Sequence, residues 1–359
     1  MNGALNRKSE RRISKGRGRM KIGLVGLPGS GKTTLFRLLT GIKEGGSPGG
    51  KDATVGAAKV PDPRIVYLSE MFKPKKTTFA QIDLTDLPGL NMGEDQKKGS
   101  NPFLTAVRNV DALVAVIQVF RDGFPHILGE INPRRDLEKI HAELLFADWE
   151  VIEKRIERLN VKKKKEDELE LELLTRCQVE LENEGRLNNL TFTTDEEELL
   201  RGFQFLTLKP LMVVLNLDEE GFKTGFPGKE EFLAELEGKG LPILEVSARL
   251  EEEIAQLSAE DRVIFMEDLG ITEPGVDRLA RMVYRCLGLI SFFTVGEDEV
   301  KAWTINQNTA AKKAAGKIHS DIERGFIRAE VVAYSNLLEH GSMAKLREKG
   351  LFRLEGKEY

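Results

Sequence analysis

Residues 26–34 restrict what this chain can fold into more than any other stretch of it. Their sequence, Gly-Leu-Pro-Gly-Ser-Gly-Lys-Thr-Thr, matches G-x-x-x-x-G-K-[ST], the phosphate-binding loop. An apolar run precedes it at 22–25 and a helix-like run follows at 35–39, so the loop is expected to join a buried strand to a helix. The glycines let backbone N–H groups point at phosphate oxygens, and the helix adds the positive end of its dipole. A nucleoside triphosphate is therefore the expected ligand.

The side chains of this loop have expected partners in the nucleotide. Lys32 would reach the β and γ phosphates, and the Thr33 hydroxyl would bind Mg²⁺. The other interpretation, a glycine-rich turn with a chance lysine, is disfavoured because both the strand and the helix flank the motif. The predicted nucleotide contacts are Gly26, Pro28, Gly29, Ser30, Gly31, Lys32, Thr33 and Thr34.

Composition narrows the class of protein. The 359 residues are enough for two or three domains, and a net charge of −4 gives no overall nucleic-acid footprint, so any RNA contact would have to be local. Cys177 and Cys286 lack metal or redox spacing and indicate a reduced cytosolic compartment. The longest apolar run, 112–117, is too short for a membrane span and predicts a core strand. Residues 1–19 are expected to form a basic disordered tail.

A second nucleotide signature follows at a distance typical of P-loop switch proteins. The strand-like segment 79–86 ends in Asp86, and Gly89 stands three residues later in a D-x-x-G pattern. Asp86 is expected to hold Mg²⁺ through water, and the Gly89 amide to sense the γ-phosphate. A glycine-rich segment between the two signatures, 44–50, is where a nucleotide-sensing switch would lie. Thr54, just after it, is either a further Mg²⁺ ligand or an ordinary loop threonine.

Two residues bear on hydrolysis. Leu90 stands where many GTPases have the glutamine that orients the attacking water, and a leucine cannot hydrogen-bond that water. Hydrolysis is therefore expected to be slow or to use another group. His126 lies in the loop after the predicted strand at 110–120, at the end of the sheet where ligands bind. It is either placed to approach a phosphate or simply exposed.

Residues 133–202 change to the pattern of two amphipathic helices. Apolar residues recur every three or four positions on both sides of a basic tip, 162–165, which predicts an antiparallel helical hairpin inserted in the α/β domain. Two interpretations of this arm stay open. It either packs only on itself, or carries its basic tip to an acidic or RNA partner.

A later loop indicates which base is bound. The strand at 211–215 ends in Asn-Leu-Asp-Glu at 216–219, where a GTPase carries N-K-x-D. Asn216 is retained, but Leu217 replaces the lysine and Glu219 replaces the aspartate that accepts hydrogen bonds from guanine. The feature that selects guanine is therefore altered, and adenine becomes tolerable.

Ser247 and Ala248 complete the order of nucleotide elements. They follow the predicted buried strand at 242–246, in the place of the element that supports the base through backbone N–H groups. The nucleotide-binding G domain is therefore expected to comprise 20–132 and 203–288, with the arm inserted between them.

The last part of the chain, 289–359, predicts a small α+β domain. Strand-like runs at 289–295 and 300–305 suggest a hairpin, and a helix over 309–323 and a strand near 327–332 follow. The predicted fold class is α/β, a P-loop NTPase G domain with a mostly parallel sheet, helices on both faces, the inserted helical hairpin and this C-terminal module.

Taken together, these residues make the chain similar to the Obg-like ATPases of the YchF type, a branch of the TRAFAC-class P-loop NTPases. The resemblance covers about 20–359. Its most specific parts are Val60-Pro61-Asp62-Pro63-Arg64, Arg135-Asp136-Leu137-Glu138, Asn216-Leu217-Asp218-Glu219, Lys301-Ala302-Trp303-Thr304 through His319, Gly325-Phe326-Ile327-Arg328-Ala329-Glu330-Val331, and Leu354-Glu355-Gly356-Lys357.

This resemblance implies a G domain with a coiled-coil insertion and a C-terminal TGS domain of the β-grasp fold. It implies Mg²⁺-dependent hydrolysis of ATP in preference to GTP and association with the ribosome. A hydrophobic residue replaces the catalytic glutamine in this group, as Leu90 does, and a histidine at the position of His126 is implied to orient the water. The chain departs from the family pattern at Gly29 and Ser30, which replace Asn-Val, and at Gly50, where the switch threonine is expected. It stops at Tyr359, before a final strand, so the TGS-like domain is expected to be incomplete.

The predicted function is thus a slow, Mg²⁺-dependent ATPase switch of the cytoplasm. The ribosome or RNA is the expected partner, rather than DNA or a membrane, and the chain is expected to be a monomer. One alternative is a GTP-preferring hydrolase, and another is a nucleotide-gated ribosome- or RNA-binding module with negligible turnover. A P-loop kinase is a weaker third alternative, since kinases do not need the elements at 216–219 and 247–248.

Overall fold

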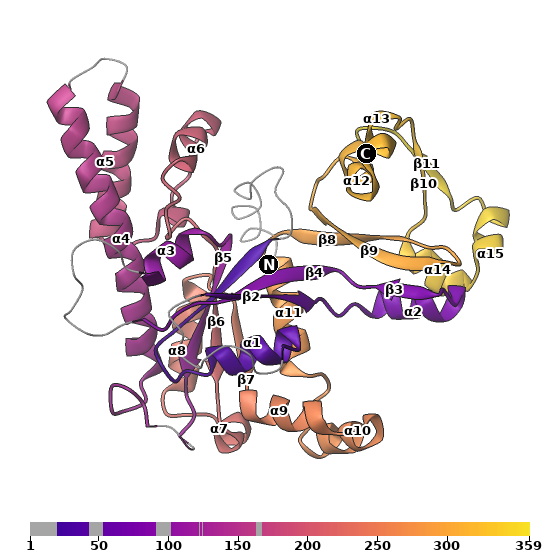
Figure 1. Cartoon of the computed structure of the whole chain (residues 1–359), viewed down its shortest axis with the longest axis horizontal. Coiled ribbons are helices and arrows are strands. Elements are labelled where there is room, and N and C mark those ends of the chain that lie inside the picture. Colours follow the sequence, from indigo (N-terminus) through magenta and orange to yellow (C-terminus); the bar gives the residue numbers. More distant parts are fainter. Residues whose placement is uncertain (1–19, 43–52, 91–101, 122, 124, 163–166) are drawn as a thin grey trace. The chain divides into compact units, whose positions relative to one another are not determined.

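The computed structural model describes residues 20–42, 53–90, 102–121, 123, 125–162 and 167–359. The predicted basic tail, the glycine-rich segment 44–50 and nearly all of the basic tip lie outside the described residues. The chain divides into two compact units, one that includes 82–287 and the segment before residue 60, and one formed by 60–81 with 288–359 (Figure 1).

The first unit is built on a six-stranded sheet of order β2-β4-β1-β5-β6-β7. Strand β1 pairs in parallel with both β4 and β5, and parallel pairing continues through β6 to β7, which confirms the predicted α/β class. The strands are β1 Lys21–Val25, β2 Thr54–Lys59, β4 Gln81–Asp86, β5 Ala112–Gln118, β6 Leu211–Asn216 and β7 Ile243–Val246.

Helices supply the layers on the sheet. Helices α3, α4 and α8 bury side chains in one core cluster, while α1 contacts both α9 and α11. Every residue of β5 and β6 is buried, as expected for parallel strands covered on both faces. The helices of this unit outside the arm are α1 Lys32–Thr40, α3 Pro102–Arg108, α7 Glu219–Thr224, α8 Lys229–Gly238, α9 Ala248–Gln256, α10 Ala259–Asp268 and α11 Gly275–Cys286.

The arm consists of α4 Pro133–Lys162 and α5 Glu168–Glu182, followed by η2 Leu187–Asn189 and α6 Thr194–Arg201. The Trp149 indole donates to Glu182, and Arg155, farther along α4, forms a two-pronged pair with Glu170, near the start of α5. Helices α4 and α5 are therefore antiparallel, as the sequence pattern indicates.

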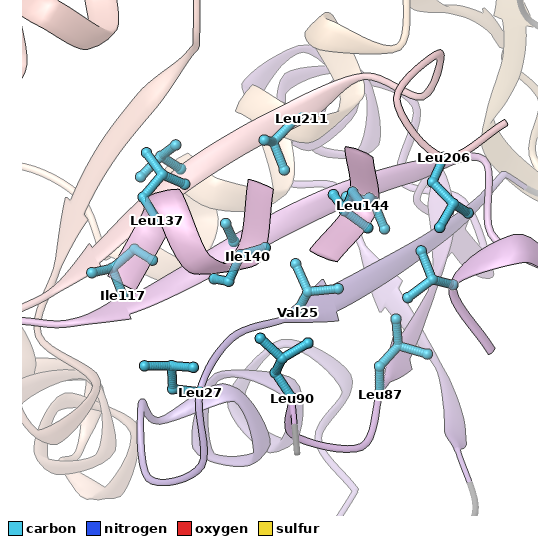
Figure 2. Packing of buried hydrophobic residues seen from close by; sticks show 14 of the residues in the cluster. Val25, Leu27, Leu87, Leu90, Ile117, Leu137, Ile140, Leu144, Leu206 and Leu211 are labelled. Atoms are coloured by element: carbon cyan, nitrogen blue, oxygen red, sulfur yellow. The ribbon is translucent and has the colours of Figure 1, made fainter. Parts of the chain in front are cut away.

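The base of the arm packs on the sheet as well as on itself. Leu137, Ile140 and Leu144 of α4 belong to the same buried cluster as Val25 of β1 and Ile117 of β5 (Figure 2). Farther along α4, Ile152 and Leu159 bury themselves instead against Leu173, Leu174 and Cys177 of α5. The inserted segment thus contributes residues to the core of the G domain and also forms a separate hydrophobic core between α4 and α5.

The second unit takes a strand from the middle of the chain. The sequence places 60–81 in the nucleotide domain, but β3 Lys76–Thr78 pairs in parallel with β9 Glu299–Asn306, and β9 pairs antiparallel with β8 Leu289–Thr294. The Thr78 hydroxyl donates to Glu299, and Lys75 forms an ion pair with Asp298 at 2.8 Å. The three-residue strand Lys-Thr-Thr carries no apolar pattern of its own, so its partner could not be predicted from local sequence.

The rest of this unit is a set of short elements. The predicted hairpin over 289–305 is present as β8 and β9, and the expected strand near 327–332 is present as β10. The remaining elements are α2 Pro63–Phe72, α12 Ala311–Ile318, α13 Ser320–Arg324, β10 Ala329–Val331, α14 Tyr334–His340, α15 Met343–Glu348 and β11 Arg353–Glu355, which pairs with β10. Among the residues that the structure describes, no helix combines the length and the apolar character needed to cross a membrane.

Candidate nucleotide-binding site

The phosphate-binding loop joins β1 to α1, as the sequence predicts. Gly31, which caps the N-terminus of α1, has a φ of 92°, and a Cβ there would lie 2.2 Å from Nδ2 of Asn216. A Cβ on Gly26 would lie 2.4 Å from the Val116 carbonyl oxygen. These glycines are required by close approach to β5 and β6, which fixes the loop at the carboxyl edge of the sheet.

The Lys32 side chain is folded into the loop. It is 6% exposed, and its Nζ donates to the carbonyl oxygens of Gly26 at 3.1 Å and Leu27 at 2.8 Å. Burial lowers the pKa of Lys32 to about 8, although nearby Asp86 opposes that effect. A phosphate would offer this ammonium group stronger, charged acceptors than the two carbonyls.

Thr33 and Asp86 come together from the two nucleotide signatures. The parallel register of β1 and β4 sets Asp86 opposite Leu24, and Thr33 Oγ1 donates to Asp86 Oδ2 at 2.7 Å. Burial raises the pKa of Asp86, against the Thr33 hydrogen bond and the charge of Lys32. Within the described residues, Asp86 Oδ1 is buried and has no hydrogen-bond partner.

These oxygens fit a magnesium ion. Mg²⁺ prefers hard oxygen ligands and is held in such sites by one or two protein groups, with phosphate oxygens and water completing the shell. No group of three or more His, Cys, Asp or Glu residues that could hold a metal occurs in the described part of the chain. Asp86 and Thr33 are thus suited to Mg²⁺ that arrives with a nucleotide.

The second signature lies directly against the loop. A Cβ on Gly89 would be 3.2 Å from Pro28 Cγ, and the Leu90 amide donates to the Gly26 carbonyl at 3.3 Å. The Leu90 side chain is 4% exposed and packs in the core cluster that contains Leu27 (Figure 2). Leu90 therefore contributes packing and no polar group at the position of the catalytic glutamine.

Asn216 ties three loops together. It is 3% exposed, its Nδ2 donates to the Ser30 carbonyl at 3.0 Å, and its Oδ1 accepts from the Ala248 amide at 3.0 Å. The Ser247 hydroxyl caps α9 by accepting from the Leu250 amide. The Ala248 amide that the sequence assigns to base support is thus used by Asn216.

The other base-loop residues point elsewhere. Leu217 is 1% exposed and belongs to the apolar core, whereas the Glu219 side chain is 56% exposed and pairs with Lys223 at 2.7 Å. Asp218, which the sequence did not single out, caps α7 and accepts from the Arg121 amide at 2.9 Å. Asp218 therefore links this loop to the chain that follows β5.

His126 is not exposed, contrary to one of its two interpretations. Its side chain is 1% exposed, Nε2 lies 2.6 Å from Oδ2 of Asp136, and Nδ1 accepts from the Leu128 amide at 3.1 Å. Asp136 lies in the first turn of α4. Sequence reasoning noted Asp136 only within a family motif, because nothing local indicates that an arm residue pairs with a histidine ten positions earlier.

Thr54 stays a predicted ligand. It is the exposed first residue of β2, and a Cβ on Gly56 in the same strand would lie 2.7 Å from Thr40, in the last turn of α1. Thr33 is at the other end of that helix, and Thr34 is half-buried beside it. The structure thus brings together the loop, Asp86, Gly89 and the loops that carry Asn216 and Ala248.

Comparison with known proteins agrees with this arrangement. A family model described as a 50S ribosome-binding GTPase matches residues 21–154, and the model YchF-GTPase_C, described as a protein of unknown function (DUF933), matches 289–359. The chain is 40% identical over 349 residues to the ribosome-binding ATPase YchF of Bacillus subtilis, covering 94% of this chain and 95% of that protein. The chain belongs to the YchF family. The ribosome-binding ATPase YchF of Escherichia coli O157:H7 is 38% identical over 347 residues, with the same coverage.

A solved YchF structure extends this similarity to the whole fold. The Schizosaccharomyces pombe YchF GTPase superposes with a TM-score of 0.83 at 29% identity, covering 97% of both chains. The chain therefore shares its overall fold with that protein.

Proposed function

We propose that this protein is a Mg²⁺-dependent P-loop nucleoside triphosphatase that hydrolyses ATP in preference to GTP. The observation that carries the proposal is the hydrogen bond between Thr33 and Asp86 at the N-terminus of α1. The other carboxylate oxygen of Asp86, Oδ1, is buried and has no hydrogen-bond partner in the described chain. Such an oxygen costs free energy unless a hydrogen-bond donor or a cation satisfies it, and a bound metal ion would do so. The names of relatives that share 38–40% of its residues, ribosome-binding ATPase YchF, support the same reaction.

Catalysis rests on positioning and charge. On nucleotide binding Lys32 would exchange the carbonyl oxygens of Gly26 and Leu27 for phosphate oxygens, while the loop amides and the α1 dipole face the same group. Mg²⁺ bound by Thr33 and Asp86 would supply positive charge against the β and γ phosphates. Leu90 donates nothing to water, so slow turnover is expected.

The base-side loops support ATP over GTP. A guanine site needs an acceptor for the N1–H and 2-amino groups, yet Leu217 is buried and apolar, and Glu219 is paired with Lys223. The Asn216 side chain is already bonded to Ser30 and Ala248. A GTP-preferring hydrolase is the alternative that this arrangement makes the weaker one.

Nucleotide affinity and phosphate release test the proposal directly. We expect ATP to compete better than GTP for the purified protein with Mg²⁺, and Lys32→Ala to reduce phosphate release on the order of 10²-fold. Lys21→Ala, an exposed lysine at the start of β1, is the matched control. GTP binding at least tenfold tighter than ATP binding would contradict the ATP assignment.

A nucleotide-gated binding module is the second candidate, favoured by the engagement of both His126 ring nitrogens and the burial of Leu90. We propose association with the ribosome in the cytoplasm, on the strength of the relatives' names. Ribosome co-sedimentation in ATP and in ADP, with single-turnover phosphate release measured alongside, separates the two. Nucleotide-dependent sedimentation without phosphate release would favour the module.

A further inference from the structure

We infer that Asp136 is a positioning residue that holds His126 in an engaged state, so that hydrolysis requires the His126–Asp136 hydrogen bond to open. The inference rests on the proposed ATP hydrolysis, with His126 in the water-orienting role that the family resemblance implies. What Asp136 controls is the fraction of molecules in which His126 is free to orient the water.

The hydrogen bonds fix the proton on the imidazole. Nδ1 accepts from the Leu128 amide at 3.1 Å, and Arg135 Nη2, which can only donate, lies 3.4 Å from the same nitrogen. The ring proton is therefore on Nε2, where it is donated to Asp136 Oδ2 at 2.6 Å. Both ring nitrogens are used within the protein.

The pair is also enclosed. The side chains of His126 and Asp136 are 1% and 2% exposed, so neither nitrogen meets solvent in this state. A histidine can orient a water only through a nitrogen within hydrogen-bond reach of it. The His126 ring must therefore leave Asp136 before it can act on a water at the nucleotide.

Arg135 keeps Asp136 in place when the histidine is neutral. Its Nε and Nη2 donate to Asp136 Oδ1 at 3.0 and 2.8 Å, and Nη2 also donates to the Glu130 carbonyl. These bonds hold Asp136 by Oδ1 and leave Oδ2 to accept the Nε2 proton of His126.

The arm supplies the fixed side of this contact. Asn132 Oδ1 accepts from the Arg135 amide, the Asn132 carbonyl accepts from the Asp136 amide, and Leu137 is anchored in the core beside Asp136. On the other side, the His126 carbonyl accepts from the Gly129 amide to close a short turn. Opening the bond therefore separates a turn in the loop after β5 from the first turn of α4.

Removal of the Asp136 charge should release the histidine and speed hydrolysis. We expect Asp136→Asn to raise the single-turnover rate of ATP hydrolysis about tenfold, the size expected for weakening one charge-assisted hydrogen bond, with ATP affinity unchanged. His126→Ala should abolish the gain, so the double variant should match His126→Ala alone. Glu138→Gln removes an exposed carboxylate from the same turn of α4 and should leave the rate unchanged.

Chemical modification provides a readout that does not depend on turnover. Carbethoxylation of His126 by diethylpyrocarbonate, followed by peptide mass spectrometry on the folded full-length protein, should be faster in Asp136→Asn than in the wild type and in Glu138→Gln. Thermal unfolding of each variant shows that it is folded.

The outcomes are distinct. A slower Asp136→Asn enzyme, or an unchanged rate with faster His126 modification, would overturn the inference and leave Asp136 as an orienting or purely structural partner. If the wild type and Lys32→Ala release phosphate at the same rate, the proposed function itself fails. Faster modification and faster hydrolysis together, both lost with His126→Ala, would support the inference.

Discussion

Two buried aspartates, Asp86 at the phosphate-binding loop and Asp148 at the base of the arm, are bonded to different extents. Asp148 is fully buried, and its oxygens accept from the Leu206 amide at 2.9 Å and from the Thr207 amide and hydroxyl at 2.7 and 2.8 Å. Asp86 accepts from Thr33 through one oxygen, and its other oxygen is unpartnered within the described structure. Burial raises the pKa of both groups.

The difference separates a structural carboxylate from a functional one. Asp148 joins α4 to a chain segment 58 residues away, and its bonds offset the cost of burying its charge. Asp86 bears part of that cost without full compensation, and a ligand cation would remove it. Substitutions at Asp86 and Asp148 test this contrast, and the change at Asp86 should have the greater effect. A third, at His141, tests how a buried titratable group on the arm affects stability.

Asp86→Asn should stop the chemistry without unfolding the protein. The amide keeps the shape of the side chain but removes the charge suited to Mg²⁺, so single-turnover phosphate release should fall on the order of 10²-fold. The free energy of unfolding, measured in urea without nucleotide, should stay the same or rise, because an incompletely bonded buried charge is gone. A loss of stability with unchanged turnover would make Asp86 a structural carboxylate like Asp148.

Asp148→Asn should have the opposite outcome. One of its oxygens becomes an amide group that faces backbone donors, so the free energy of unfolding should fall by about 3 kcal/mol. ATP affinity of the folded fraction should be unchanged. Glu150→Gln, on the same helix and in an exposed pair with Lys154, is the control and should cost less than about 1 kcal/mol. Equal losses for the two variants would show that the Asp148 bonds do not hold the arm.

His141, also on α4, should make stability fall in mild acid. Burial lowers the pKa of His141 to about 4 from 6.5, with contributions from Arg186 and Lys239. Because the unfolded chain then binds the proton more tightly, this stability is complete above pH 6.5 and is lost as pH falls toward 4. From pH 7 to pH 5 the loss should reach about 2 kcal/mol. Urea unfolding of His141→Gln at both pH values should show a smaller loss, and an equal loss would exclude His141 as the cause.

Much of the nucleotide site was predictable because its residues follow the ends of strands. The phosphate-binding loop, Asp86 and Asn216 each lie at the end of a strand that the sequence predicts, and the carboxyl ends of parallel strands meet at one edge of a sheet. Local sequence was therefore enough to anticipate which loops converge there.

Three sets of contacts could not be predicted from the sequence. Two depend on partners far away in the chain, and the third depends on the conformation of the phosphate-binding loop. The Asp148–Thr207 bonds span 59 residues, and the pairing of Asp136 with His126 crosses from a loop into a helix. The self-bonding of Lys32 to Gly26 follows from how the loop closes, which the motif does not specify.

The strand β3 gives the C-terminal unit a particular order of assembly. Thr78 and Glu299 are joined across 221 residues, so the chain that forms one edge of that three-stranded sheet is synthesised long before the strand that receives it. Until β9 emerges, residues 76–78 have no sheet to join. A protein cut before residue 288 would keep β3 without a partner, and one started after residue 81 would leave an edge of β9 open to pairing with other chains.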